Sequence, residues 1–153
     1  MNIYGEIKLL YSRYGEWPVA YHGTRSNSLN SILEQGFRPS TSGCFLHEMK
    51  GMHIVNLSPS IEYAGHPRYA EPVHRGNSWV QVVLQVRINP QLLVVKRQGT
   101  LPGALPSDPT PADPHFSNTE LEWLLTALPG THLSATDIVV SGIMLRVTDE
   151  HPR

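Results

Sequence analysis

Residues 78–88, with the sequence SWVQVVLQVRI, constrain the fold of this chain more than any other stretch. They combine β-branched residues with a partial alternation of apolar and polar side chains, which is typical of a strand that packs on a core. Residues 137–147, DIVVSGIMLRV, show a similar pattern near the end of the chain. We therefore predict two long strands and a β-sheet that contains them.

One helix is predicted between residues 26 and 37, SNSLNSILEQGF. Apolar residues recur there at the spacing of one helical face, namely Leu29, Ile32 and Leu33. Ser26 or Asn27 could cap the start of the helix with a side-chain oxygen. Gly36 suits the left-handed conformation that often ends a helix, so we expect the helix to stop there.

Short strands are predicted on either side of this helix, at residues 19–23 (VAYHG) and 53–58 (HIVNLS). A second helix should follow the later of these strands. Ser58 would be its N-cap, and Pro59 would occupy the first helical position, where a missing N–H costs nothing. Pro67 should end or kink this helix, because proline cannot donate the next hydrogen bond of the helix.

The second half of the chain is predicted to be mostly strand and loop. Residues 91–99, QLLVVKRQG, predict a further strand, and residues 99–118 are rich in proline and glycine, which predicts a long surface loop. Residues 119–125, TELEWLL, suit either a strand or a helix. The order strand, helix, strand, helix and then mostly strands predicts an α+β domain with a largely antiparallel sheet.

Length and composition favour a single globular domain. The chain has 153 residues, of which 40% are hydrophobic and 16% charged, so it can bury a core of useful size. Its formal net charge of −1 argues against a strongly basic surface for nucleic acid. No stretch approaches the roughly 18 apolar residues of a membrane span, and the start lacks the layout of a signal peptide. We expect a cytoplasmic or nuclear protein with no membrane partner.

Cys44 is the only cysteine, which excludes an intrachain disulfide and a four-cysteine zinc site. Cys44, His47 and His53 have side chains that can bind zinc. Their spacing matches no common zinc site, and no fourth ligand is evident. A nucleophilic role for Cys44 with one of the histidines has no better support. We therefore expect no metal.

His22, Gly23 and Thr24 stand at the end of the first predicted strand. A histidine in that place is often a hydrogen-bonded structural residue, but it can also bind a ligand. A glycine beside it lets a ligand approach the backbone N–H and C=O groups closely. The Thr24 hydroxyl could orient the same ligand or cap the helix that follows.

Two tyrosines and two glutamates are further candidates for a site. Tyr63 lies on the second predicted helix and could pack on the sheet or stack on a planar heterocycle, and Tyr69 is a weaker candidate for the same role. In a strand, Glu120 and Glu122 would point to the same face, opposite the apolar residues Leu121, Trp123 and Leu125. They are either two solvated surface groups or carboxylates that hold a sugar hydroxyl or polarise a nucleophile.

These segments together resemble the catalytic domain of ADP-ribosyltransferases of the poly(ADP-ribose) polymerase type. The matching motifs are YHGT, ILEQGF, KGMHIVNLSPSIEYA and NTELEWLL, and the resemblance covers about residues 18–147. It implies an ADP-ribosyltransferase-like fold, in which a split antiparallel β-sheet with flanking helices forms a cleft for NAD. It also implies that residues 1–153 are one catalytic domain, which could have been cut from a larger protein.

The resemblance implies a role for each matching residue in binding NAD. His22 would hydrogen-bond the adenosine ribose, and the Gly23 backbone would hold the nicotinamide carboxamide with help from Thr24. Tyr63 would stack on the nicotinamide ring, and Tyr69 would be a second aromatic neighbour.

The resemblance also implies that Glu122 or Glu120 holds the 2′-hydroxyl of the nicotinamide ribose. In the toxin-like branch of the superfamily the second member of a Glu-x-Glu pair is the essential one, which favours Glu122. The expected activity is the transfer of a single ADP-ribose unit from NAD to a protein acceptor, with release of nicotinamide. A nucleic acid acceptor is less favoured.

Two other functions remain open. RNA 2′-phosphotransferases resemble the chain in the HGT motif and in MHIVNLS, and they transfer an RNA 2′-phosphate to NAD. Such an enzyme needs clustered basic residues, whereas the arginines here are dispersed. An inactive module that binds NAD or ADP-ribose is the third possibility. The sequence also departs from the polymerase type, which often has Gly-Ile-Tyr-Phe where this chain has GMHIVNL, and it lacks the helical regulatory domain of some members.

Overall fold

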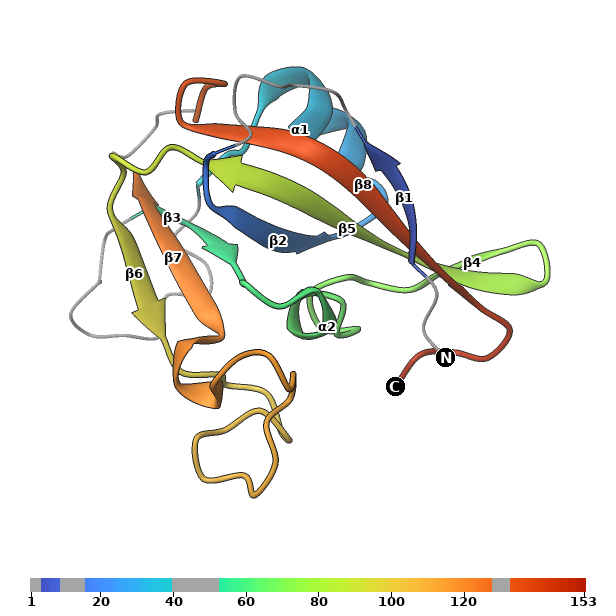
Figure 1. Ribbon diagram of the computed structural model, residues 1–153. Coiled ribbons are helices and arrows are strands. Elements are labelled where there is room, and N and C mark those ends of the chain that lie inside the picture. The colour runs from blue at the N-terminus through green and yellow to red at the C-terminus, as the bar shows by residue number, and fades with distance from the viewer. Residues whose placement is uncertain (1–3, 9–15, 40–52, 128–132) are drawn as a thin grey trace.

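The computed structural model describes residues 4–8, 16–39, 53–127 and 133–153 (Figure 1). In chain order these residues form β1 (Tyr4–Lys8), β2 (Val19–Thr24), α1 (Leu29–Gln35), β3 (His53–Leu57), α2 (Ile61–Ala64), β4 (Val73–Arg75), β5 (Ser78–Ile88), β6 (Val94–Arg97), the 3₁₀ helix η3 (Asn118–Glu120), β7 (Glu122–Ala127) and β8 (Ile138–Thr148).

The named strands form two antiparallel sheets. The larger sheet has the order β1-β8-β5-β2, with β4 paired to one end of β5, and the smaller sheet has the order β3-β7-β6. β5 and β8 are the two long strands predicted from the sequence, and they pair with each other at the centre of the larger sheet. The prediction of an α+β domain with largely antiparallel sheets is confirmed.

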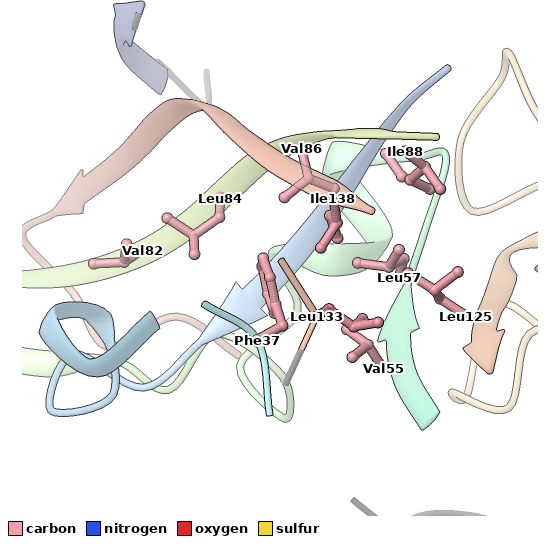
Figure 2. Close-up of a cluster of buried hydrophobic side chains, with 11 residues drawn as sticks. Phe37, Val55, Leu57, Val82, Leu84, Val86, Ile88, Leu125, Leu133 and Ile138 are labelled. Atoms are coloured by element: carbon pink, nitrogen blue, oxygen red, sulfur yellow. The ribbon is translucent and has the colours of Figure 1, made fainter. Parts of the chain in front are cut away.

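The two sheets join where β2 passes the end of β3. The Tyr21 N–H donates to the Ser58 carbonyl oxygen at 2.7 Å, and the Ser58 N–H donates to the Tyr21 carbonyl oxygen at 2.9 Å. Side chains from both sheets pack together in one apolar cluster (Figure 2). Its buried members are Ala20, Phe37, Val55, Leu57, Val82, Leu84, Val86, Ile88, Leu125, Leu133 and Ile138.

β5 is buried on both of its faces, which explains its nearly continuous apolar sequence. Its side chains at positions 82, 84, 86 and 88 enter the central cluster. Val83 points to the other face and packs with Ala64, Ala70 and Met144. The sheet therefore has α2 and the segment after it on the face opposite the central cluster.

α1 ends where the sequence predicted but starts later. Gly36 has a φ of 79° and donates its N–H to the Ile32 carbonyl oxygen, as expected of a residue that stops a helix. The predicted N-cap, Ser26 or Asn27, is wrong. Ser28 occupies that position, and its side chain makes no capping hydrogen bond.

α2 is a short helix with a different cap from the one predicted. Ser60 is the N-cap, and its hydroxyl oxygen accepts the Tyr63 N–H at 3.1 Å. Ser58 is therefore not the cap, and Pro59 lies before the helix and not in its first turn. The helix ends at Ala64, ahead of the break that we predicted at Pro67.

The proline-rich segment before η3 has no regular strand or helix, as predicted, but it is well packed. The Asn118 side-chain amide donates to the Leu105 carbonyl oxygen at 2.9 Å, and its oxygen accepts the Ala112 N–H at 2.9 Å. Asp113 is 5% exposed, and its carboxylate accepts the Ser60 hydroxyl at 2.6 Å. The segment is therefore attached to the N-terminus of α2.

Gln81 of β5 should be one of the most sensitive positions for stability. Its side chain is 1% exposed, and its amide donates to the carbonyl oxygens of Gly65 (2.9 Å) and Ala70 (2.7 Å). Gln81→Leu would leave both carbonyls without that donor, which should lower the free energy of unfolding by about 2 kcal/mol or more. Urea denaturation measures this. Gln98→Leu, at an exposed position, is the matched control, and an equal effect of the two changes would contradict the prediction.

Candidate functional site

A cavity of about 240 Å³ opens beside the junction of the two sheets. Its wall includes His22 and Gly23 of β2, Asn56 of β3, Tyr63 of α2 and Glu122 of β7. These residues come from four elements spread between positions 22 and 122 of the sequence, so the cavity exists only in the folded chain.

The structure brings together most of the residues that the sequence singled out, but not all. His22, Gly23, Tyr63, Tyr69 and Glu122 all line the cavity. Thr24 and Glu120 are not among the described residues of its wall. Thr24 is 3% exposed and donates its hydroxyl to the Arg25 carbonyl oxygen at 3.2 Å, so it neither faces the cavity nor caps α1.

The expectation that Glu120 and Glu122 share one face of a strand is wrong. Glu120 is the last residue of η3, whereas Glu122 is the first residue of β7. Between them Leu121 is fully buried, packed with Tyr63. The helical backbone of η3 continues through Leu121 (φ −75°, ψ −18°) and breaks the alternation of a strand, so the two carboxylates do not form a pair.

His22 is held by β3. Its Nδ1 lies 2.8 Å from the Asn56 carbonyl oxygen. A carbonyl only accepts, so Nδ1 carries the hydrogen, and in the neutral ring Nε2 retains a lone pair. Burial lowers the pKa of His22 and outweighs the hydrogen bond to Asn56, which would raise it. The site therefore contains a neutral histidine that can accept a hydrogen bond.

Gly23 is required by packing and also presents its backbone to the site. A Cβ at this position would overlap the Ala64 carbonyl oxygen and lie 2.9 Å from the Ala70 nitrogen. Alternate residues of a strand direct their N–H and C=O groups to the same edge. Because Tyr21 bonds Ser58 across the outer edge of β2, the Gly23 N–H and C=O point to that edge as well. The packing role of Gly23 depends on its missing Cβ, whereas the predicted ligand role depends on its backbone N–H and C=O.

The Glu122 carboxylate is bound asymmetrically. Its Oε1 accepts hydroxyl hydrogens from Tyr63 (2.7 Å), Thr100 (2.7 Å) and Tyr69 (3.2 Å). Among the described residues, no hydrogen bond uses its Oε2. One oxygen of the carboxylate is therefore fixed by the protein, and the other is available to a ligand.

The two tyrosines differ in burial. Tyr63 is 4% exposed and packs with Leu101, Ala104 and Leu121, whereas Tyr69 is half-buried. Their ring centroids are 5.6 Å apart. Burial raises the pKa of both hydroxyl groups above their usual range, so both remain protonated donors to Glu122.

Sequence reasoning missed several residues of the cavity wall, among them Asn56, Arg68 and Thr100. Asn56 acts through its backbone carbonyl, which no side-chain pattern reveals. Thr100 lies in a proline-rich loop without periodicity. Arg68 was counted among dispersed arginines. Its position between the two tyrosines of the site, at 63 and 69, was the one signal that could have identified it.

Arg68 supplies a cation to the cavity wall. Its side chain is exposed, and it forms no ion pair with the part of the chain that the structure describes. By contrast, Arg25 pairs with Glu71 at 3.2 Å. Arg68 is therefore free to contact an anion that enters the cavity.

The residues weighed for zinc are only partly described. Cys44 and His47 lie outside the described residues, and His53 begins β3. Within the described ranges there is no group of three or more histidine, cysteine, aspartate or glutamate side chains that could hold a metal ion.

No protein-family model matches the chain. Among the residues that the structure describes, no helix has the length and apolar character needed to cross a membrane.

Stability should depend on pH through His22. Its pKa is lower in the folded protein than the ordinary value of 6.5, so below about pH 6.5 the unfolded chain binds more protons and the free energy of unfolding falls. His66, whose pKa is also lowered, contributes in the same direction. Urea denaturation at about pH 7.5 and about pH 5.5 should show this fall.

Two variants test whether the fall in the free energy of unfolding comes from His22. In His22→Gln the fall between the two pH values should be smaller, because one of the two groups responsible is gone. His115→Gln, at an exposed histidine, should keep the full fall. An unchanged fall in His22→Gln would contradict the prediction.

Proposed function

We propose that this chain is an NAD-dependent ADP-ribosyltransferase with an ADP-ribosyltransferase-like split sheet, and that it transfers single ADP-ribose units to a protein acceptor. The observation that carries the proposal is the content of one cavity: a neutral histidine, a strand edge at glycine, two tyrosines and a carboxylate with one unused oxygen. These are the groups that the resemblance in sequence would require for NAD.

The strand edge of β2 suits a carboxamide. The nicotinamide amide has one acceptor and two donor hydrogens, and the Gly23 N–H and C=O offer the complementary pair. Tyr69, whose ring is half-buried, would supply the larger aromatic face to the nicotinamide, and Tyr63 would act mainly through its hydroxyl. The Nε2 lone pair of His22 would accept a ribose hydroxyl.

The proposed reaction breaks the bond between ribose C1′ and the nicotinamide nitrogen. The bonding electron pair leaves with nicotinamide, and positive charge develops on the ribose. The Glu122 carboxylate, bound through Oε2 to the ribose 2′-hydroxyl, would stabilise that charge. The acceptor nucleophile then bonds to C1′ and loses a proton, so that NAD⁺ and the acceptor yield ADP-ribosylated acceptor, nicotinamide and H⁺.

The size of the cavity supports binding of part of the dinucleotide. At about 240 Å³ it falls just below the roughly 300–1,000 Å³ of typical small-molecule pockets. Nicotinamide and its ribose are the half of NAD that such a space would enclose. The pyrophosphate would then lie at the opening, where Arg68 offers a guanidinium group.

Glu122→Gln should reduce nicotinamide release from NAD by at least about 100-fold, because the variant loses the charge that stabilises the ribosyl cation. Glu120→Gln is the matched control, since Glu120 lies outside the cavity wall, and it should keep near-normal activity. Chromatography of released nicotinamide measures both. Equal losses, or a loss only in Glu120→Gln, would contradict the assignment of Glu122.

Three further measurements distinguish the proposed function from the alternatives. Calorimetric binding of NAD without nicotinamide release would identify an inactive binding module. Transfer of phosphate from a 2′-phosphorylated RNA to NAD would identify a phosphotransferase. Release of nicotinamide together with labelling of a protein acceptor by NAD radiolabelled in its adenylate would support the proposal.

Arg68→Gln should weaken NAD binding by about 10-fold, since a guanidinium hydrogen bond to a phosphate is charge-assisted. Binding of free nicotinamide should not change, because that molecule carries no phosphate. Calorimetry with the two ligands tests this, and Arg75→Gln, at an exposed arginine outside the cavity wall, is the control. Equal weakening for nicotinamide would argue against a phosphate contact.

A further inference from the structure

We propose that Thr100 is a positioning residue that holds the Glu122 carboxylate in one orientation, with Oε1 bound to protein hydroxyl groups and Oε2 presented to the substrate. This inference rests on the proposed function, because the substrate that Oε2 would meet is the ribose of NAD.

Thr100 reaches Glu122 by two routes. Its hydroxyl donates directly to Oε1 at 2.7 Å. Its backbone N–H donates to the Tyr63 hydroxyl oxygen at 3.0 Å, and that hydroxyl donates to the same Oε1 at 2.7 Å. With Tyr69 as a third donor, Oε1 has more partners than its two lone pairs ideally bind. A further ligand hydroxyl would therefore bind Oε2.

The backbone of Thr100 is itself fixed by its neighbours. The Gly99 N–H donates to the Asn118 carbonyl oxygen at 2.7 Å, and a Cβ on Gly99 would overlap the Ala104 carbonyl oxygen. Leu101 and Ala104 are 2% and 3% exposed and pack in the same cluster as Tyr63. Thr100 is thus an exposed residue on a tightly packed turn, which distinguishes it from an ordinary loop threonine.

Fixing the carboxylate should matter more for the reaction than for binding. A glutamate side chain has several rotamers, and charge stabilisation in the transition state depends on a carboxylate that is already in place. Without the Thr100 hydroxyl the two tyrosines still reach Oε1, so the site would remain assembled but less well ordered. We expect a lower kcat with little change in KM for NAD.

The experiment compares Thr100→Val, Thr100→Ser and Thr110→Val. Valine removes the hydroxyl and keeps the backbone N–H that binds Tyr63, whereas serine keeps both. Thr110 is an exposed threonine of the same loop and lies outside the cavity wall. In Thr100→Val, kcat for nicotinamide release should fall about 10-fold with KM within about twofold, as expected for loss of a hydrogen bond to a charged group. Thr100→Ser should recover most of this, and Thr110→Val should behave as the unaltered protein.

A crystal structure of Thr100→Val provides a second measurement that does not depend on activity. It should show the Glu122 carboxylate in a new orientation or in more than one. An unchanged kcat, a fall that Thr100→Ser does not reverse, or an unmoved carboxylate in Thr100→Val would each overturn the role of Thr100. If the unaltered protein releases no nicotinamide but Glu122 does reorient in Thr100→Val, the proposed function fails and the positioning role stands.

Discussion

The pair of backbone hydrogen bonds between Tyr21 and Ser58 is the contact on which the rest of the structure depends. It joins the edge of β2 to the end of β3, and so connects the larger sheet to the smaller one. It also brings Asn56 close enough to receive the His22 hydrogen bond. Beyond this contact the chain leaves the sheet toward α2, and the edge of β2 at Gly23 stays directed at the cavity.

The loop between β6 and η3 completes the site from the other side. It contributes Thr100 to the Glu122 network, and it is attached to α2 by the hydrogen bond between Ser60 and Asp113. Ser60 in turn caps the helix that carries Tyr63. A carboxylate from β7, a phenol from α2 and a hydroxyl from the loop are thereby held as one hydrogen-bonded group, which no single element could provide.

Local sequence patterns predicted the secondary structure correctly where a single type of interaction determines it. The two long strands, the end of α1 at Gly36 and the loop character of the proline-rich segment were all predicted correctly. Errors arose where neighbouring residues compete. Several serines and asparagines could have capped the helices, and Ser60 is the cap of α2 while its hydroxyl also donates to Asp113, 53 residues away along the chain. Spacing alone contains no information about such a partner.

The sequence by itself determined the α+β class, the antiparallel strands and a short list of candidate residues, because these follow from side-chain periodicity and from glycine and proline. The tertiary structure decided which of these candidate residues line the cavity. It separated Glu122 from Glu120, since the helical backbone of η3 and Leu121 breaks the strand alternation, and it added Thr100 from a loop with no periodic signal. The physical reason is that the groups of the cavity are held by hydrogen bonds between segments that are separated in the sequence, such as His22 with Asn56 and Thr100 with Glu122.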